Sequence, residues 1–355
     1  MELKKIRLQE LESFLTSDFF RDLETKPISP ARVASYVNNP HAEAEDPVLY
    51  LLHDDTKLIA FRTLYPARLM NQSKRIAWLS GNWVHPDYRR RGYSTQLLTE
   101  ALKDWEERLL FTNYAPASLQ VYLKSEFFTP MFLEDGVRFY FFVKTADLLR
   151  DRFKGMTLFF KVVDVFIRLL ANLMRLLYHP RRWKQLNIDV LDLPDEACYR
   201  LVEAKKDSYL FERGQKELEW IFAYPWVSTA KKDWLPNYPF SSYASQFHYK
   251  TVKFMKGRRL IGFLIYSIRD GHLKTVHLQL PQNSLWVAAR FLIQLSVRKK
   301  IEILTILEPE LAKKIQKHAN PFLFHKRIEQ GIYSSFPISA AMRKIQDGEG
   351  DFIFT

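Results

Sequence analysis

Three arginines, a glycine and a serine in the first third of the chain have the types and spacing that bind an anion. They form the stretch Arg89-Arg90-Arg91-Gly92-Tyr93-Ser94, which follows a β-rich run from Ile76 to Val84. A helix N-terminus presents unpaired N–H groups and the positive end of its dipole, and Gly92 lets the backbone approach a ligand closely. The arginines add charge, while Ser94 is small and can cap the helix. The stretch therefore predicts a cradle for a pyrophosphate.

A helix is expected directly after this cradle, because apolar residues recur there at a spacing of three or four. They are Leu97, Leu98, Ala101, Leu102, Trp105 and Leu109. The loop lacks the third glycine and the later acidic residue of a dinucleotide fingerprint, and it lacks the Gly-Lys-Ser/Thr of a Walker loop. Both of those nucleotide-binding classes are therefore excluded.

The order Val84-x-Pro86 followed by Arg89-x-x-Gly92-x-Ser94 resembles the acyl-CoA-binding motif of the GCN5-related N-acetyltransferase (GNAT) superfamily. The resemblance implies an enzyme that moves an acetyl or other acyl group from acyl-CoA to an amine acceptor by direct attack. No residue is assigned to a metal. The residues expected to bind acetyl-CoA are Trp83, Val84, Arg89, Arg90, Arg91, Gly92, Tyr93 and Ser94.

The predicted fold is mixed α/β, with two GNAT-like domains in tandem at residues 1–147 and 186–355 and a helical linker at 148–185. After the cradle helix the first domain is expected to continue with a strand at 118–123, a short helix at 126–133 and a strand at 138–144. The second domain repeats the element order without the cradle. Its expected elements are strands at 246–255, 260–269 and 273–280, a helix at 284–297, a strand at 301–307, a helix at 310–318 and two closing strands.

The linker contains a wide apolar helical face, with its polar residues Lys161, Asp164, Arg168, Asn172 and Arg175 at a spacing of three or four. A membrane span is not expected, because each ionisable residue would cost about 2.5–3.5 kcal/mol at the bilayer centre. A linker helix buried between domains is the favoured interpretation. The alternative is an interfacial helix in which residues 155–184 contact a membrane peripherally, helped by the basic run from Arg181 to Lys184.

The catalytic residues do not follow from the motif. N-acylation needs an acceptor for the amine proton and a donor to the developing oxyanion. GNATs often place a carboxylate on the strand before the cradle, where this chain has Ser80 and Asn82. They also often carry a tyrosine acid four residues before a glycine that ends a short helix; counted back from Gly136, that position is Phe132. The remaining candidates are Asn82, Tyr122 at the end of the expected strand, Glu126, and the C-terminal carboxylate of Thr355, which some tandem GNATs use as base.

Composition limits the other functions. The chain has 355 residues and a formal net charge of +13, yet it has no zinc-finger spacing or RNA-recognition signature, so no nucleic-acid partner is expected. Its single cysteine, Cys198, is expected to be buried and inert, and a cytoplasmic location is expected. The acids of residues 19–46 could receive a cationic acceptor. Two alternatives stay open: an aminoacyl or acyl transferase of cell-envelope or polysaccharide synthesis, and a non-catalytic CoA-binding module.

Overall fold

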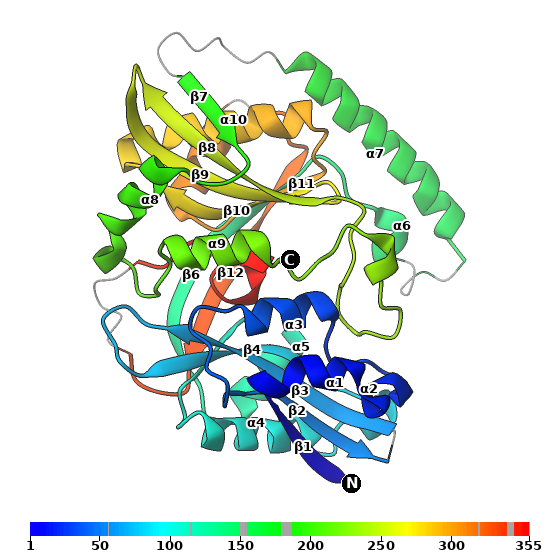
Figure 1. The fold of residues 1–355 in the computed structure, drawn as a ribbon. Helices are drawn as coiled ribbons and strands as arrows, with labels where there is room; N and C mark the ends of the chain where they lie inside the picture. Colours follow the sequence, from blue (N-terminus) through cyan, green and yellow to red (C-terminus); the bar gives the residue numbers. More distant parts are fainter. Residues whose placement is uncertain are drawn as a thin grey trace. The chain divides into compact units, whose positions relative to one another are not determined.

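A computed structural model gives the fold of the chain (Figure 1). It describes residues 1–55, 57–113, 116–149, 153, 155–178, 187–318, 320–338 and 344–354, without the side chains of 116–118 and 147–148. The chain forms two compact units, each built from segments that are separate in sequence. Unit 1 comprises residues 1–133, 199–247 and 330–355, and unit 2 comprises residues 134–198 and 248–329.

The sheet of unit 1 has the strand order β1-β2-β3-β4-β5-β12. Neighbours from β1 to β4 are antiparallel, β4 and β5 are parallel, and the end of β12 pairs antiparallel with β5. The bounds are β1 (Glu2–Arg7), β2 (Pro47–Asp54), β3 (Lys57–Arg68), β4 (Arg75–Val84), β5 (Leu109–Thr112) and β12 (Phe324–Ser334).

Helix α4 (Tyr93–Asp104) provides much of the core of unit 1, because its apolar stripe packs against β2, β3 and β4. Leu97, Leu98 and Ala101 are fully buried there, as the period of the sequence predicts. The other helices of this unit are α1 (Leu11–Thr16), α2 (Asp18–Asp22), α3 (Pro30–Val37), α5 (Pro116–Lys124) and α9 (Gln215–Ala223), with single 3-10 turns η1 (Leu8–Glu10), η2 (Pro86–Tyr88), η3 (Lys206–Ser208), η4 (Lys231–Asp233) and η6 (Gly350–Phe354).

The sheet of unit 2 has the order β6-β11-β10-β9-β8-β7, in which β10 and β11 are parallel. Its strands are β6 (Thr129–Tyr140), β7 (Asn187–Leu191), β8 (Phe247–Lys256), β9 (Arg259–Arg269), β10 (His272–Gln279) and β11 (Ile303–Ile306). Its helices are α6 (Thr145–Leu149), α7 (Thr157–Leu177), α10 (Leu285–Arg298) and α11 (Pro309–Lys317), with the turn η5 (Gln282–Ser284); α8 (Glu196–Glu203) begins in this unit.

The two halves of the chain repeat one pattern, which confirms the predicted tandem α/β fold. In the first, β2, β3 and β4 are followed by α4 and by β5, which is parallel to β4; in the second, β8, β9 and β10 are followed by α10 and by β11, which is parallel to β10. The last strand of each repeat completes the other sheet, since β6 pairs with β11 and β12 pairs with β5. The domain boundaries placed after residues 147 and 185 stay a prediction.

Several predicted elements are wrong, each for a local reason. Residues 118–123 belong to helix α5 rather than a strand, because Pro116 opens a helix that buries one side. The expected helix at 126–133 is a turn followed by β6, since Glu126 has a left-handed φ of 60°. Leu109, expected in the helix after the cradle, belongs to strand β5, because Glu106 and Glu107, with left-handed φ of 49° and 58°, separate the strand from the helix.

The prediction that the linker helix is buried is also wrong. Helix α7 spans 21 residues, and only Phe160 and Ala171 are buried. The C-terminal tail, expected to form a strand, ends in the 3-10 turn η6. Among the residues that the structure describes, no helix is long and apolar enough to cross a membrane.

Candidate functional site

The predicted cradle is a loop with two left-handed residues between β4 and α4. Arg90 has a φ of 64°, and Gly92, with a φ of 84°, is the N-cap residue of α4. A Cβ atom at Gly92 would meet nothing within 4 Å, so the space beside this N-cap position is open. The first N–H groups of α4, from Tyr93 onward, have no partner within the helix and can receive an anion.

The side chains of this loop surround the helix N-terminus with positive charge. Arg89, Arg90 and Arg91 are exposed. Arg89 Nε donates to the carbonyl oxygen of Val84 at 3.3 Å, and the Arg91 guanidinium lies 5.2 Å from the ring centroid of Tyr88. The expected cap by Ser94 is wrong, because Ser94 is the second residue of α4 and its hydroxyl points elsewhere.

A buried arginine that the sequence analysis missed joins β3, β4, α4 and α5. Arg62 of β3 is completely buried. Its Nη1 donates to Tyr122 Oη at 2.8 Å, and its Nη2 donates to Asn82 Oδ1 at 3.3 Å and to the carbonyl oxygen of Ser94 at 3.1 Å. Ser94 Oγ in turn donates to Asn82 Oδ1 at 3.0 Å. We call Arg62, Asn82, Ser94 and Tyr122 the Arg62 cluster.

The hydrogen-bond directions in the Arg62 cluster leave two of its members, Asn82 and Tyr122, able to donate to a further acceptor. A guanidinium can only donate, so the oxygen of the Asn82 amide must face Arg62, and its NH2 group faces away. The Tyr122 oxygen accepts from Arg62 and keeps its own hydrogen to give to another acceptor. The cluster can therefore stabilise a developing negative charge, but it contains no carboxylate that could act as a base.

Glu126, another catalytic candidate, is not part of the Arg62 cluster. Glu126 is exposed in the turn after α5, and Thr355 lies outside the described residues. Phe132 and Gly136 both belong to β6, so the count back from a helix-ending glycine was wrong. The helix at this point of the chain is α5, and the tyrosine that it carries is Tyr122.

A signal for Arg62 was present in the sequence. Arg62 is the single charged residue in the apolar run from Leu58 to Leu64. An arginine is almost never fully buried unless it is paired. A charged side chain in the middle of a buried strand therefore predicts polar partners inside the fold.

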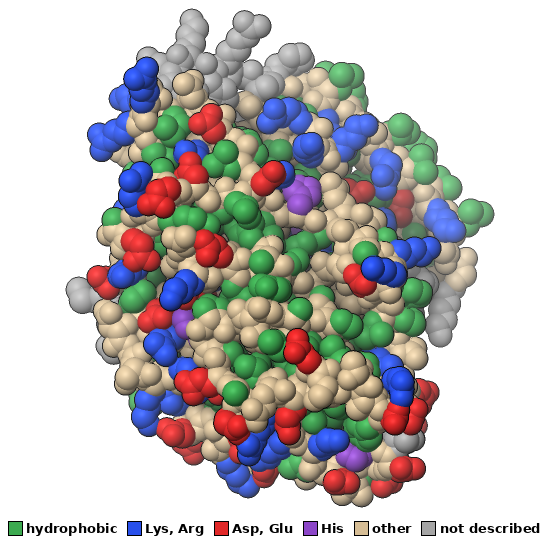
Figure 2. All heavy atoms as spheres, in the orientation of Figure 1, with side chains coloured by type: hydrophobic (Ala, Val, Ile, Leu, Met, Phe, Trp, Pro, Cys, Tyr) green, Lys and Arg blue, Asp and Glu red, His purple; other side chains and the backbone are tan. Residues whose placement is uncertain are grey.

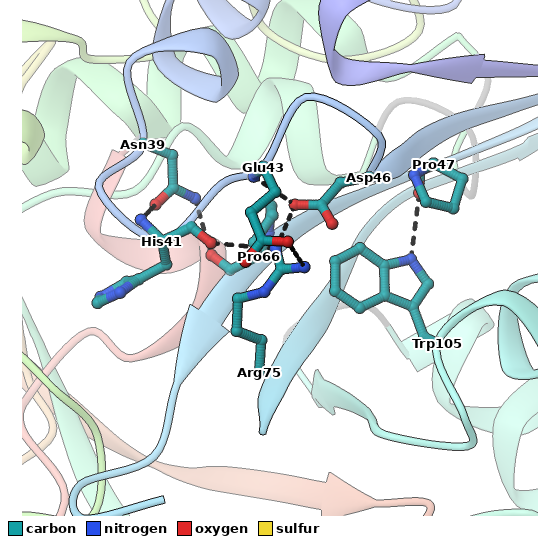
Figure 3. A network of polar contacts seen from close by, with 8 residues as sticks. All are labelled: Asn39, His41, Glu43, Asp46, Pro47, Pro66, Arg75 and Trp105. Atoms are coloured by element: carbon teal, nitrogen blue, oxygen red, sulfur yellow. Dashed lines mark hydrogen bonds and ion pairs between the residues drawn. The ribbon is translucent and has the colours of Figure 1, made fainter. Parts of the chain in front are cut away.

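The loop between α3 and β2, expected to receive the acceptor, has its acids paired within the protein (Figure 3). Arg75 Nη1 lies 2.5 Å from Asp46 Oδ2, and Arg75 Nη2 lies 2.8 Å from Glu43 Oε2. Asn39 Nδ2 donates to the carbonyl oxygen of Pro66 at 2.8 Å and fixes the loop to β3. These carboxylates are therefore satisfied without a cationic ligand.

This loop places His41 between two glutamates beside a small cavity of about 40 Å³. His41 Nε2 lies 3.2 Å from Glu217 Oε1, and His41 Nδ1 lies 3.9 Å from Glu212 Oε2. The ligand atoms of His41, Glu212 and Glu217 lie within 4.8 Å of one another, a set that could hold a metal ion, although the close contact between His41 and Glu217 already explains the arrangement. Burial acts to raise the pKa of Glu217, but hydrogen bonds from His41 and the backbone outweigh it, so the pKa is lowered.

A second buried ion pair borders the same cavity. Glu349 lies 2.8 Å from Arg213 Nη2. Burial raises the pKa of Glu349, and Arg213 only partly opposes that effect. Gly350, at the start of η6, lies against β4 and β5: a Cβ atom built there would be 2.7 Å from Thr112 Cγ2. The tail residues thus help to close the face of the unit 1 sheet opposite α4.

Comparison with known proteins identifies the part of the chain that contains the cradle. Residues 8–127 match the family model described as the acetyltransferase (GNAT) family. We call these residues, which are similar to the GNAT family, the GNAT segment. The GNAT segment includes the cradle, helix α4 and every member of the Arg62 cluster. No curated protein matches the chain.

Solved structures are similar to the GNAT segment and to most of the remaining chain. A GCN5-related N-acetyltransferase from Kribbella flavida is 14% identical, with 93% of this chain and 71% of that chain covered and a TM-score of 0.46. A probable N-acyltransferase from Enterococcus faecalis is 12% identical, with 94% and 72% covered and a TM-score of 0.49. A tandem GNAT protein from the clavulanic acid biosynthesis pathway is 11% identical, with 95% and 99% covered and a TM-score of 0.47.

Proposed function

We propose that this protein is an N-acyltransferase that moves an acetyl or other acyl group from acyl-CoA to an amine acceptor by direct attack. The open, positively charged N-terminus of α4, in a segment that matches the GNAT family model, is the observation that carries the proposal. The N–H groups that follow Gly92 would hold the pyrophosphate, and Arg89, Arg90 and Arg91 would add charge. Trp83 and Val84, at the end of β4, would line the path of the remaining CoA.

The reaction requires one bond to form and one to break. The amine nitrogen bonds to the acyl carbon, the carbon–sulfur bond of the thioester breaks, and the amine loses a proton while the sulfur gains one. Negative charge develops first on the carbonyl oxygen and then on the sulfur. Donors that are fixed before the reaction stabilise such charge at no cost of reorganisation.

The Arg62 cluster supplies donors of this kind. We propose that the Asn82 NH2 group donates to the carbonyl oxygen as it becomes negative, and that Tyr122 Oη gives its proton to the leaving sulfur. Arg62 is a positioning residue in this account, because it fixes the orientation of both groups. Ser94 links the cluster to the cradle through its hydroxyl.

No member of the Arg62 cluster can take the amine proton. The acceptor would therefore attack in its neutral form, or the proton would leave through a base elsewhere, such as Glu126. These two assignments give different pH profiles. If the amine attacks in its neutral form, kcat/KM rises tenfold per pH unit up to the pKa of the acceptor itself. A protein base would instead give a plateau above its own pKa.

Release of free CoA from acetyl-CoA, measured against a panel of amines, tests the proposal. The panel should include small polyamines, amino sugars, amino acids and lysine peptides, with aminoacylated and longer acyl donors in a second set. Release that depends on the amine, with the acylated amine found by mass spectrometry, supports N-acyl transfer. Tight acetyl-CoA binding without release on any amine would instead support the non-catalytic CoA-binding module. Activity confined to amino-sugar acceptors would favour the envelope or polysaccharide alternative.

A further inference from the structure

Helix α7 packs on unit 2 through polar residues together with Phe160 and Ala171, and it leaves most of its apolar residues exposed. Asp164 Oδ1 accepts from the Thr145 backbone N–H at 2.7 Å and from the Thr145 hydroxyl at 2.6 Å, which caps α6. Burial acts to raise the pKa of Asp164, but these hydrogen bonds and Arg168 outweigh it, so the pKa is lowered and the carboxylate stays charged. One end of the polar face of α7 is thus held by specific bonds.

Two arginines hold the rest of the polar face. Arg175 Nη2 donates to the carbonyl oxygen of Ile301 at 2.7 Å, and its guanidinium lies 4.4 Å from the ring centroid of Phe141. Arg168 lies 4.2 Å from the ring centroid of Phe142 and 3.4 Å from a carboxylate oxygen of Glu302. Because Ala171 is fully buried on the same side, the rotation of α7 about its axis is determined.

The opposite side of α7 is an exposed surface without a charged residue. At about 100° per residue, ten apolar side chains fall within an arc of about 140°. Leu158 and Leu176 are 76% and 75% exposed. We call this surface the α7 apolar face; it consists of Leu158, Phe159, Val162, Val165, Phe166, Leu169, Leu170, Leu173, Leu176 and Leu177. Figure 2 shows apolar side chains gathered over α7, with Lys and Arg beside them.

The sequence on both sides of α7 is basic. Residues 150–184 contain nine Lys or Arg and two Asp, a formal excess of seven positive charges within the +13 of the whole chain. Arg150, Arg152 and Lys154 precede the helix, and Arg181, Arg182 and Lys184 follow it. An apolar arc with basic residues at both ends matches a layer of anionic lipid headgroups over acyl chains.

We propose that the α7 apolar face is a docking surface for an anionic membrane, in which the helix lies parallel to the bilayer surface. A second copy of this chain fits less well, because pairing two α7 helices would bring two basic segments together in either orientation. The face also lacks the polar and aromatic anchor residues, Tyr, Trp and Arg, that are typical of protein interfaces. The proposal does not depend on acyl transfer, since it concerns unit 2 and needs no acyl-CoA.

Vesicle sedimentation of the full chain, without acyl-CoA, tests the proposal. Vesicles of phosphatidylcholine with about one-third phosphatidylserine should bind at least about tenfold more tightly than phosphatidylcholine alone, and salt should weaken binding. Leu169→Glu should reduce binding to the anionic vesicles about tenfold or more. Leu193→Glu is the matched control, because Leu193 is also in unit 2 and is 57% exposed, against 60% for Leu169. It should bind as the wild type does.

A fluorescent label gives a second measurement that does not depend on stability. Phe166→Cys can carry an environment-sensitive dye, since the native Cys198 is buried. The label should report water without vesicles and an apolar environment with anionic vesicles. No vesicle binding, equal loss in both glutamate variants, or a label already shielded without lipid would overturn the proposal. A lipid-free dimer that Leu169→Glu dissociates would assign the face to a second copy instead.

Discussion

Arg62 Nη1 donates a hydrogen bond to Tyr122 Oη at 2.8 Å, across 60 residues of sequence. The bond joins the middle of β3 to the end of α5, and both side chains are buried. It gives the phenol a fixed acceptor role toward Arg62 and leaves the phenol hydrogen for another group. This relationship connects the fold of the GNAT segment to the proposed chemistry.

Tyr122→Phe should lower kcat without weakening acyl-CoA binding. A positioned general acid contributes about 10²–10⁴-fold, so a loss of about a hundredfold in kcat is expected. The variant also leaves Arg62 one hydrogen bond short, which costs about 1–3 kcal/mol of stability. Steady-state kinetics with titration of acetyl-CoA, together with urea unfolding, separates the two effects.

Tyr50→Phe is the matched control for this variant. Tyr50 is also buried in unit 1, and its hydroxyl donates to Asp104 Oδ2 at 2.9 Å. Its loss should cost similar stability and leave kcat within about twofold of wild type. If the two variants lower kcat equally, Tyr122 has only a structural role.

Asn82→Asp should distinguish the acceptor role of the Asn82 amide oxygen from the donor role of its NH2 group. A carboxylate can still accept from Arg62 and Ser94, so the variant should be at least as stable as wild type. It cannot donate, and it places a negative charge where the oxyanion would form. We therefore expect kcat to fall by about a hundredfold or more. Unchanged kcat would remove Asn82 from the mechanism; Asn82→Ala should lose both activity and stability.

The charged Glu217 carboxylate should stabilise the folded protein at neutral pH but not in acid. Its pKa is lowered in the folded protein, so its contribution is fully present above the ordinary value of 4.5 and is lost as the pH falls through the folded value. Glu217→Gln should lower the free energy of unfolding by about 1–3 kcal/mol at pH 7. Denaturant unfolding at a series of pH values should show the two proteins converging below pH 4.5. A constant difference would contradict the assignment.

Cys198 should be inert in the native protein. Burial raises the pKa of its thiol to about 12, so almost no thiolate is present at pH 8. An aromatic disulfide reagent should therefore react with one thiol per chain in urea and with none under native conditions. Rapid native reaction would show that α8 opens readily. A silent Cys198 also keeps the background of the CoA-release assay low.

The sequence predicted features that depend on neighbouring residues and failed where distant segments meet. The cradle is continuous from Trp83 to Ser94, so the glycine and arginines that define its geometry are neighbours in the sequence. The Arg62 cluster combines four elements, and nothing in the sequence around Tyr122 pairs it with Arg62. The exchange of the last strands, in which β6 pairs with β11 and β12 pairs with β5, was missed for the same reason, since strand order does not follow from the order of elements along the chain.

Helix α7 shows a second limit of periodicity. The spacing of its polar residues correctly defined two faces, but the prediction that the apolar face is buried was wrong. Which face packs depends on the partners that the rest of unit 2 offers. Here the N-terminus of α6, the carbonyl of Ile301 and the ring of Phe142 satisfy Asp164, Arg175 and Arg168.

Calorimetric titration of acetyl-CoA into wild type, Gly92→Asp, Gly92→Asn and Gly257→Asp tests the central claim, that the cradle holds acyl-CoA. Gly257 matches Gly92, because it too has a left-handed φ, of 60°, and open space around its Cβ position. Asparagine at Gly92 imposes comparable backbone strain without charge, so it separates strain from repulsion. We expect Gly92→Asp to weaken binding at least about tenfold more than Gly92→Asn, and Gly257→Asp to bind as wild type. No binding by wild type, or equal binding by all four proteins, would contradict the assignment of the cradle.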